Sequence, residues 1–182
     1  VKTVETLSQL SPKQIIAVVG FDAEGVKKAL GNKVVYAHQK EQLGTGDATK
    51  YGLEKVEDDI DTVVVINGDD SFFYKAKTIE EILDLHLSSK NTLTFATLEL
   101  EDPAGLGRVI RENGQVVKIV EEKEASEAER KTKEVNDGLY VFKKEWLKNN
   151  ISNLKQSERG KEYYLINLVE EAIEQGEKLS AY

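Results

Sequence analysis

Residues 39–48 place amide side chains and a glycine pair where a predicted strand, residues 33–37, gives way to a predicted helix. Gly44 and Gly46 let the backbone approach a flat ligand closely, and the Gln39 amide offers both a donor and an acceptor to a base edge. The segment is therefore a candidate binding segment, although a glycine-rich connection between a strand and a helix is more often a plain turn. It lacks the G-x-x-x-x-G-K-[ST] pattern of a P-loop.

A second candidate site follows residues 63–66, an apolar run that predicts a buried strand of a parallel sheet covered on both faces. The run leads directly into Asn67, Gly68, Asp69 and Asp70. Mg²⁺ takes one or two carboxylates and completes its octahedron with water and substrate phosphates. Asp69 is therefore the candidate metal ligand and the candidate catalytic residue, whereas Asp70 is interpreted as a solvated turn residue. The pattern is equally consistent with an Asp69 that only caps a turn.

Gly107, Glu121 and Asn136 form a third group, each beside an apolar run in the second half of the chain. Side chains of this kind can hydrogen-bond sugar hydroxyls, although a lone Glu or Asn at a strand end is ordinarily a surface residue. Ligands bind at the carboxyl ends of the strands in an open α/β sheet, which is why segments that follow strands are the ones to weigh.

The composition limits the chemistry to oxygen ligands, amides and lysine. With 182 residues and 40% apolar residues, the chain predicts one compact domain. Its net charge of -8 argues against a nucleic-acid partner. There is no Cys, and His38 and His86 have no partners at metal or triad spacing, so thiolate and histidine metal sites are disfavoured. No run is long enough to cross a membrane, and no signal peptide precedes the first element, so we expect a cytoplasmic protein without a membrane partner.

The elements that must position these residues alternate between strand and helix through the first half of the chain. This order predicts an α/β fold with a doubly wound, Rossmann-like mixed sheet. Asp22 is expected to cap one helix, Gly31 to end it, and Thr78 to open another through a capping box. We interpret residues 1–182 as a single domain without a linker or internal repeat.

The second half of the chain predicts a β-hairpin, because Asn113-Gly114 is a preferred pair for a type I′ turn between apolar runs. A charged helix is expected near residues 125–131, a strand over 139–142, and a helix around Trp146. The last expected helix carries Leu165 and Ile173. The chain has no Met, begins at helical spacing without a cap and stops where a strand begins, so we expect both ends to be cut.

In this order, the segments resemble the uridylyltransferase domain of the bifunctional N-acetylglucosamine-1-phosphate uridyltransferase family, a branch of the sugar nucleotidyltransferases. The resemblance covers nearly the whole chain. The motifs that carry it are Gln39-x-x-Gln42-Leu43-Gly44-Thr45-Gly46-x-Ala48, Gly68-Asp69, Pro103-x-Gly105-x-Gly107-Arg108, Ile119-Val120-Glu121-x-Lys123, Glu134-Val135-Asn136-x-Gly138 and Glu162-Tyr163-Tyr164-Leu165.

The resemblance implies transfer of a uridylyl group from UTP to N-acetylglucosamine 1-phosphate with Mg²⁺ as cofactor, in the synthesis of a cell-wall precursor. It implies small-molecule substrates as the only partners, and it leaves the oligomeric state open. The implied site comprises the nucleotide-binding residues Gln39, Gln42, Gly44, Thr45, Asn67 and Gly68, the sugar-binding residues Gly107, Glu121 and Asn136, and Asp69 as metal ligand.

The chain departs from the family pattern at several positions. Asn67 stands where the family commonly has Tyr, Asp137 where it has Thr, and Asn167 where it has Asp. The family's opening Gly-rich loop with its Arg, a Pro-Lys pair and a second metal-binding Asn do not occur in this sequence, nor does an acetyltransferase half. We therefore expect this chain alone to have little transferase activity. Two alternatives stay open: a sister enzyme for glucose or mannose 1-phosphate, and a non-catalytic nucleotide-sugar-binding domain.

Overall fold

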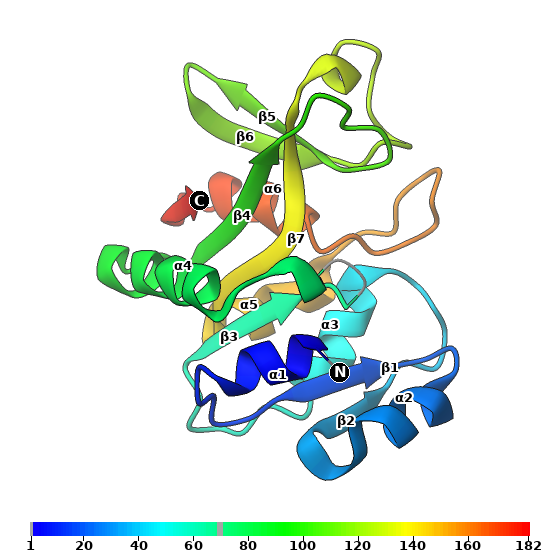
Figure 1. Cartoon of the computed structure of the whole chain (residues 1–182). Helices are drawn as coiled ribbons and strands as arrows, with labels where there is room; N and C mark the ends of the chain where they lie inside the picture. The colour runs from blue at the N-terminus through cyan, green and yellow to red at the C-terminus, as the bar shows by residue number, and fades with distance from the viewer. Residues whose placement is uncertain (1, 69–70) are drawn as a thin grey trace.

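The computed structural model describes residues 2–68 and 71–182 (Figure 1). The α-helices are α1 (Lys2–Ser8), α2 (Ala23–Leu30), α3 (Thr45–Leu53), α4 (Ala76–Ser89), α5 (Lys144–Asn150) and α6 (Asn167–Glu174). The 3₁₀ helices are η1 (Gly31–Lys33), η2 (Ser71–Phe73), η3 (Glu129–Lys131) and η4 (Ile151–Asn153). The strands are β1 (Ile16–Val19), β2 (Val35–His38), β3 (Thr62–Ile66), β4 (Leu93–Glu99), β5 (Arg108–Glu112), β6 (Gln115–Val120), β7 (Glu134–Lys143) and β8 (Leu179–Ala181).

The strands form two sheets. β1 and β2 pair in parallel, and a mixed six-stranded sheet has the order β6-β5-β7-β4-β8, with β3 paired to β7 off this path. The long strand β7 runs through the middle of the molecule and connects the β5–β6 hairpin at one end with β3 at the other (Figure 1). The expected mixed α/β fold is thereby confirmed.

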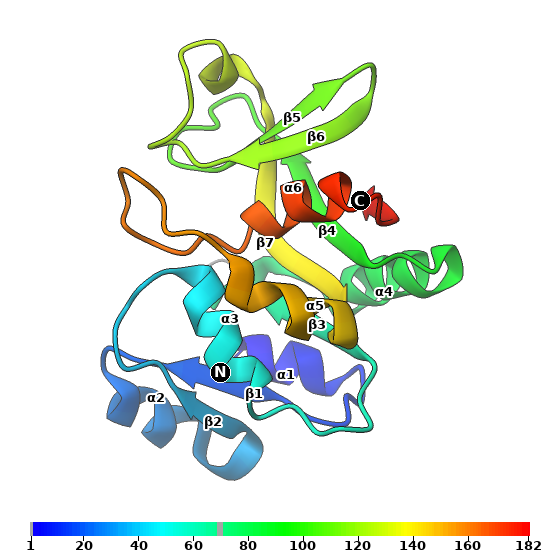
Figure 2. The same ribbon diagram turned by 180° about the vertical axis from the view of Figure 1, so that it is seen from behind.

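Helices cover both faces of the larger sheet. α4 lies on one face, and α5 and α6 lie on the other, as the two opposite views show (Figures 1 and 2). Side chains alternate along β7, so Tyr140 and Phe142 belong to the core under α5 and α6, whereas Leu139 and Val141 belong to the core under α4. Both cores fix the position of β7 firmly, which matters because β7 carries part of the candidate site.

An apolar cavity of about 890 Å³ lies between β1 and β3, lined also by residues of α1 and α3. Among the residues described, β1 pairs with β2 alone and β3 with β7 alone. No backbone ladder therefore joins the two sheets within the part of the chain that the structure describes. Within the same residues, no helix is both long and apolar enough to cross a membrane.

Several local expectations hold, because short-range chemistry decides them. Asn113 and Gly114 both have positive φ, 50° and 81°, as a type I′ hairpin turn requires. Gly31 ends α2 with φ 58°, and residues 179–181 form a strand. The helix expected around Trp146 is α5, and Trp146 is buried in the core.

Other expectations are wrong. β3 is not a strand of a parallel sheet, because it pairs antiparallel with β7, and all of its residues are only half-buried. Asp22 precedes α2 but makes no side-chain cap bond. Thr78 does not open α4, which begins at Ala76, since the Thr78 amide already donates to the Lys75 carbonyl at 3.1 Å. The charged helix expected near residues 125–131 is only the 3₁₀ turn η3.

Candidate functional site

The candidate site lies where β7 changes its pairing partner along one edge. Val135 of β7 pairs with Arg108 at the start of β5, and Leu139 pairs with Ile66 at the end of β3. Residues 136–138 lie between these two ladders, so the end of β3 and the start of β5 meet at one notch in the sheet. Side chains that are far apart in the sequence are brought together there.

Two backbone hydrogen bonds hold the sides of this notch. The Asn136 amide donates to the Gly107 carbonyl at 2.8 Å, and the Asn67 amide donates to the Gly138 carbonyl at 3.1 Å. Gly138 has φ 74°, and a Cβ there would lie 2.5 Å from the Asn67 amide nitrogen Nδ2, so only glycine fits this crossing. The structure therefore places three sequence-predicted residues, Asn67, Gly107 and Asn136, around one point.

A buried polar cluster lies beside the notch. Asn136 Oδ1 is buried and has no hydrogen-bond partner among the described residues. Burial raises the pKa of the Tyr140 phenol, a hydrogen bond with the Asn136 side chain opposes the rise, and the Glu121 charge adds to it. Tyr140 thus lies close to both sugar-binding candidates. A buried acceptor without a partner costs free energy unless a ligand supplies a donor, so this cluster suits a molecule rich in N–H and O–H groups.

Glu121 follows β6 directly and is half-buried. Burial raises the pKa of its carboxyl above the usual value, the nearby Glu162 charge raises it further, and Lys123 opposes both. Glu121, Tyr164 and Asn167 line a polar cavity of about 270 Å³. A carboxylate held in such a place accepts hydrogen bonds from a ligand more strongly than an exposed carboxylate does.

The glycine loop, residues 43–46, lies against the segment 162–165, which we call the bridging segment. The Tyr163 amide donates to the Leu43 carbonyl and the Gly46 amide donates to the Tyr163 carbonyl, both at 2.7 Å. The Leu165 amide donates to Thr45 Oγ1 at 3.0 Å. Because Glu162 of the same segment also lies near Glu121, the bridging segment connects the two halves of the candidate site.

Both glycines of the loop are required by this contact. A Cβ on Gly44 would lie 2.8 Å from the Tyr163 carbonyl oxygen, and one on Gly46 would lie 2.9 Å from the same atom. The close approach that the sequence pattern assigns to a ligand is, in the structure, an approach to the protein's own backbone. Nucleotide binding by these glycines stays a prediction.

Replacing Gly44 with Ala is expected to lower the melting temperature by several degrees. Its φ of 99° and ψ of -179° are open to glycine almost alone, at about 1–3 kcal/mol for another residue, and the added methyl meets the Tyr163 backbone. Gly31→Ala is the matched control, because Gly31 has φ 58°, ψ -136° and open space around its Cβ position. Thermal unfolding of both variants should show the larger fall in melting temperature for Gly44→Ala. Equal falls would show that the contact with the Tyr163 backbone does not contribute.

Gln39 is oriented by its neighbours in the glycine loop. Its Nε2 donates to Asp47 Oδ2 at 2.8 Å and to the Gly44 carbonyl at 3.2 Å. The amide oxygen Oε1 accepts no hydrogen bond from any described residue. With both hydrogens of the amide used inside the protein, Gln39 presents an acceptor to a ligand. Gln42 lies nearby, with its Nε2 within 3.7 Å of the Cβ position of Gly20.

The predicted metal ligand Asp69 lies outside the described residues, as does Asp70. Gly68 follows β3, and no atom of the described residues other than its chain neighbours lies within 4 Å of its Cβ position. Among the residues that the structure describes, no three His, Asp or Glu side chains are grouped to hold a metal ion. His86 is buried and its Nδ1 lies 3.0 Å from Thr94 Oγ1, whereas His38 is exposed, in agreement with structural or solvated roles.

The sequence pattern missed several residues around the notch. Tyr140 occupies an alternating apolar strand, which hides a polar role. Tyr74 donates to the Asp137 carbonyl at 3.3 Å, and this contact joins the segment after η2 to the notch. Glu162 was noticed only as part of a motif, although its charge acts on Glu121. The one sequence signal for Tyr140 is its hydroxyl group, which is unusual inside an apolar run.

Known proteins with similar sequences were found over nearly the whole chain. The family model described as nucleotidyl transferase matches residues 2–182. The bifunctional protein GlmU of Bacillus licheniformis is 42% identical over 180 residues, which are 98% of this chain and 39% of that protein. The bifunctional protein GlmU of Bacillus subtilis is 40% identical over 180 residues, with the same two coverages. The chain thus spans about two fifths of the length of these curated relatives.

Solved structures with the same fold include two sugar-nucleotide enzymes. A putative glucose-1-phosphate thymidylyltransferase from Bacillus anthracis, in complex with a sucrose, has a TM-score of 0.72 and 21% identity, covering 98% of this chain and 71% of that one. An apo UDP-glucose pyrophosphorylase has a TM-score of 0.75 and 13% identity, covering 98% and 76%. At these identities the likeness concerns the fold.

Proposed function

Because the chain belongs to the nucleotidyl transferase family, we propose that it forms UDP-N-acetylglucosamine and pyrophosphate from UTP and N-acetylglucosamine 1-phosphate. The observation that carries the proposal is the pair of Asn136 and Glu121 beside the notch. Asn136 Oδ1 is a buried acceptor without a hydrogen-bond partner in the described part of the chain, and Glu121 is a half-buried carboxylate whose pKa burial raises. An N-acetylated sugar offers an amide N–H and hydroxyl groups, which are the donors that these two acceptors lack.

In the proposed reaction, a phosphate oxygen of the sugar 1-phosphate attacks the α-phosphorus of UTP. A phosphorus–oxygen bond forms there, and the bond from the α-phosphorus to the bridging oxygen breaks, so that pyrophosphate leaves with the electron pair. The attacking oxygen is already anionic near neutral pH, so no general base is needed. Catalysis then consists of positioning and charge stabilisation.

The described residues act in this scheme by binding and orienting. Gln39 Oε1 accepts a hydrogen bond from the N3–H of uracil, which cytosine lacks. Glu121 and Asn136 hold the sugar, and the Gly107 backbone borders it. The bridging segment keeps the glycine loop and Glu121 in register, so that the two substrates bind side by side.

Mg²⁺ is the cofactor that this proposal includes. The tip of β3 fits such an ion, because Gly68 has open space around it and a single carboxylate is enough when phosphates complete the coordination. Asp69 would be the protein ligand. When bound, the ion neutralises charge on the triphosphate.

A sister activity on another sugar 1-phosphate is the second candidate. Asn67 and Asp137 depart from the family pattern, and both lie at the notch: Asn67 contacts Gly138, and Asp137 lies between Asn136 and Gly138. Changes there alter the surroundings of a bound sugar rather than those of the base.

Pyrophosphate release by the complete protein tests the proposal. Each nucleoside triphosphate is combined with the 1-phosphates of N-acetylglucosamine, glucose and mannose. We expect UTP with N-acetylglucosamine 1-phosphate to be the best pair by at least about tenfold, because buried groups are left unpaired when the acetamide is missing. A higher rate with glucose or mannose 1-phosphate would replace this proposal with the sister activity, and no release with any pair would favour a binding domain.

Gln39→Ala is expected to raise the KM for UTP about fivefold, the worth of one neutral hydrogen bond of about 1 kcal/mol, with little change in the KM for the sugar phosphate. Discrimination between UTP and CTP should fall as well. The exposed neighbour Glu41, replaced by Ala, is the control and should behave as wild type. Steady-state kinetics with each substrate varied in turn provides the measurement; equal losses for both substrates would argue against a role for Gln39 in base selection.

A further inference from the structure

Arg108 is the largest fully buried side chain of the described residues, with 2% exposure, and the proposed function gives it no role. It is the first residue of β5 and follows Gly107 directly. A buried guanidinium is costly unless each of its donors has a partner. The contacts of Arg108 therefore indicate which segments this buried side chain holds together.

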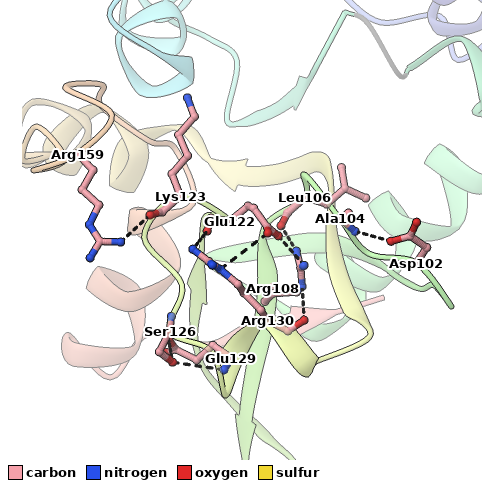
Figure 3. Close-up of polar contacts among 10 residues, drawn as sticks. All are labelled: Asp102, Ala104, Leu106, Arg108, Glu122, Lys123, Ser126, Glu129, Arg130 and Arg159. Atoms are coloured by element: carbon pink, nitrogen blue, oxygen red, sulfur yellow. Dashed lines mark hydrogen bonds and ion pairs between the residues drawn. The ribbon is translucent and has the colours of Figure 1, made fainter.

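The Arg108 guanidinium connects three separate segments (Figure 3). Nη2 donates to Glu122 Oε2 at 2.6 Å, in an ion pair. Nη1 donates to the Leu106 carbonyl, and Nε donates to the Arg130 carbonyl at 3.4 Å. One side chain thus ties the loop before β5, the loop after β6 and the 3₁₀ turn η3 to each other.

Glu122 is the common partner of two arginines. Its carboxylate pairs with Arg108 and lies 3.8 Å from Arg130 Nε, while its carbonyl accepts from Arg130 Nη2 at 3.2 Å. The same loop is fastened at its other side by Arg159, whose Nη1 donates to the Lys123 carbonyl at 2.9 Å (Figure 3). These bonds hold residues 121–124 from both sides.

Each partner of the Arg108–Glu122 ion pair is the immediate neighbour of a proposed sugar-binding residue. Gly107 precedes Arg108, and Glu121 precedes Glu122. Partial burial and the nearby Glu162 charge both raise the pKa of Glu121. The backbone of Gly107 is in turn bonded to Asn136.

We propose that Arg108 and Glu122 are positioning residues, whose ion pair between a buried guanidinium and a half-buried carboxylate sets the places of Gly107 and Glu121 and thereby the affinity of the site for the sugar 1-phosphate. This inference rests on the proposed function for its substrate, and on the structure alone for its effect on the two loops. Neither residue touches the reacting atoms. The ion pair holds the two loops that carry Gly107 and Glu121, as the residues around a precise binding site must do.

Glu122→Gln is the test variant, because it keeps the size of the side chain and one acceptor for Arg108 but removes the charge shared by the two arginines. Glu134→Gln is the matched control: Glu134 also pairs with an arginine of β5, accepting from Arg111 Nε and Nη2 at 2.7 Å each, but that pair does not adjoin Gly107 or Glu121. Arg108→Lys is the second variant, since a lysine cannot reach all three partners of the guanidinium at once.

In the complete protein, Glu122→Gln is expected to raise the KM for N-acetylglucosamine 1-phosphate about fivefold, with kcat and the KM for UTP within about twofold of wild type. Arg108→Lys should also raise the KM for N-acetylglucosamine 1-phosphate. Glu134→Gln should leave all three constants unchanged. An unchanged KM for the sugar phosphate in both test variants would overturn the proposal, as would a loss of kcat and thermal stability without a change in KM.

Amide hydrogen exchange provides a readout that does not depend on any substrate. The Glu124 and Ala125 amides donate to the Glu121 carbonyl, both at 2.9 Å, and the Leu106 amide donates to the Pro103 carbonyl at 3.2 Å. These amides should exchange faster in Glu122→Gln than in wild type or Glu134→Gln. Unchanged exchange would refute the positioning role even in a protein that uses another sugar, whereas faster exchange without use of N-acetylglucosamine 1-phosphate would refute only the proposed function.

Discussion

Replacing Asp69 with Asn in the complete protein is expected to lower turnover about a hundredfold or more, the loss that follows removal of one preorganised electrostatic group. The proposed transition state is stabilised mainly by charge, and a neutral amide keeps the shape of the side chain but not the charge that would hold Mg²⁺ against the triphosphate. The melting temperature without ligand should not change, because a side chain at an open strand tip contributes little to the core. Steady-state kinetics over a range of Mg²⁺ concentrations and thermal unfolding are the two measurements.

Asp70→Asn is the control for Asp69, since it makes the same chemical change at the next residue of the sequence. It should retain turnover and Mg²⁺ dependence close to those of wild type. Near-normal turnover in Asp69→Asn with a normal requirement for Mg²⁺ would exclude Asp69 from the site. If both variants lose turnover equally, the charge of the turn rather than one ligand is what matters.

Glu121→Gln is expected to raise the KM for the sugar 1-phosphate about five- to tenfold, while it raises the melting temperature at neutral pH. Hydrogen bonds to a charged acceptor are worth about 1.5–3 kcal/mol, against about 0.5–1.5 for a neutral one, so the site loses binding. The free protein gains stability, because it no longer keeps an ionised carboxylate out of water beside Glu162. A substitution that weakens substrate binding but stabilises the free protein indicates that the original side chain serves function rather than stability.

The stability gain of Glu121→Gln should depend on pH in one direction. The pKa of Glu121 in the folded protein lies above its usual value of 4.5, so ionisation disfavours the folded state, and this effect is complete only above the folded pKa. As the pH falls through that pKa towards 4.5, the wild-type carboxyl becomes protonated and the difference in melting temperature should shrink. A difference that stays constant or grows on acidification would contradict a buried, functional carboxylate.

The fold could be predicted where neighbouring residues decide the structure. Asn113-Gly114 specifies a tight hairpin turn through the φ angles of two adjacent residues, and Gly31 ends a helix in the same local way. The pairing of β3 could not be predicted, because its partner β7 lies more than seventy residues further along the chain. An apolar run shows that a strand is buried without showing which strand will lie beside it, or in which direction.

In the candidate site, too, the sequence identified some residues, whereas the role of others depends on contacts with distant parts of the chain. The sequence identified Gly107, Glu121 and Asn136 as related residues, and the structure brings Gly107 to Asn136 and places Glu121 near Tyr140 at the same notch. The buried Arg108 could not be distinguished from a surface arginine at a strand end, because only the fold surrounds it with Leu106, Glu122 and Arg130. The glycines of the loop were recognised as special, but their close neighbour is the Tyr163 backbone.

The central claim is that the glycine loop and the notch in the sheet together form one site for a uridine sugar nucleotide. A crystal structure of the complete protein with UDP-N-acetylglucosamine tests this claim most directly. The account predicts uracil N3–H within hydrogen-bond distance of Gln39 Oε1, and the N-acetylated sugar in contact with Glu121 and Asn136, whose buried Oδ1 then gains its donor. A nucleotide bound away from the glycine loop, or a sugar that leaves Asn136 Oδ1 without a partner, would contradict it.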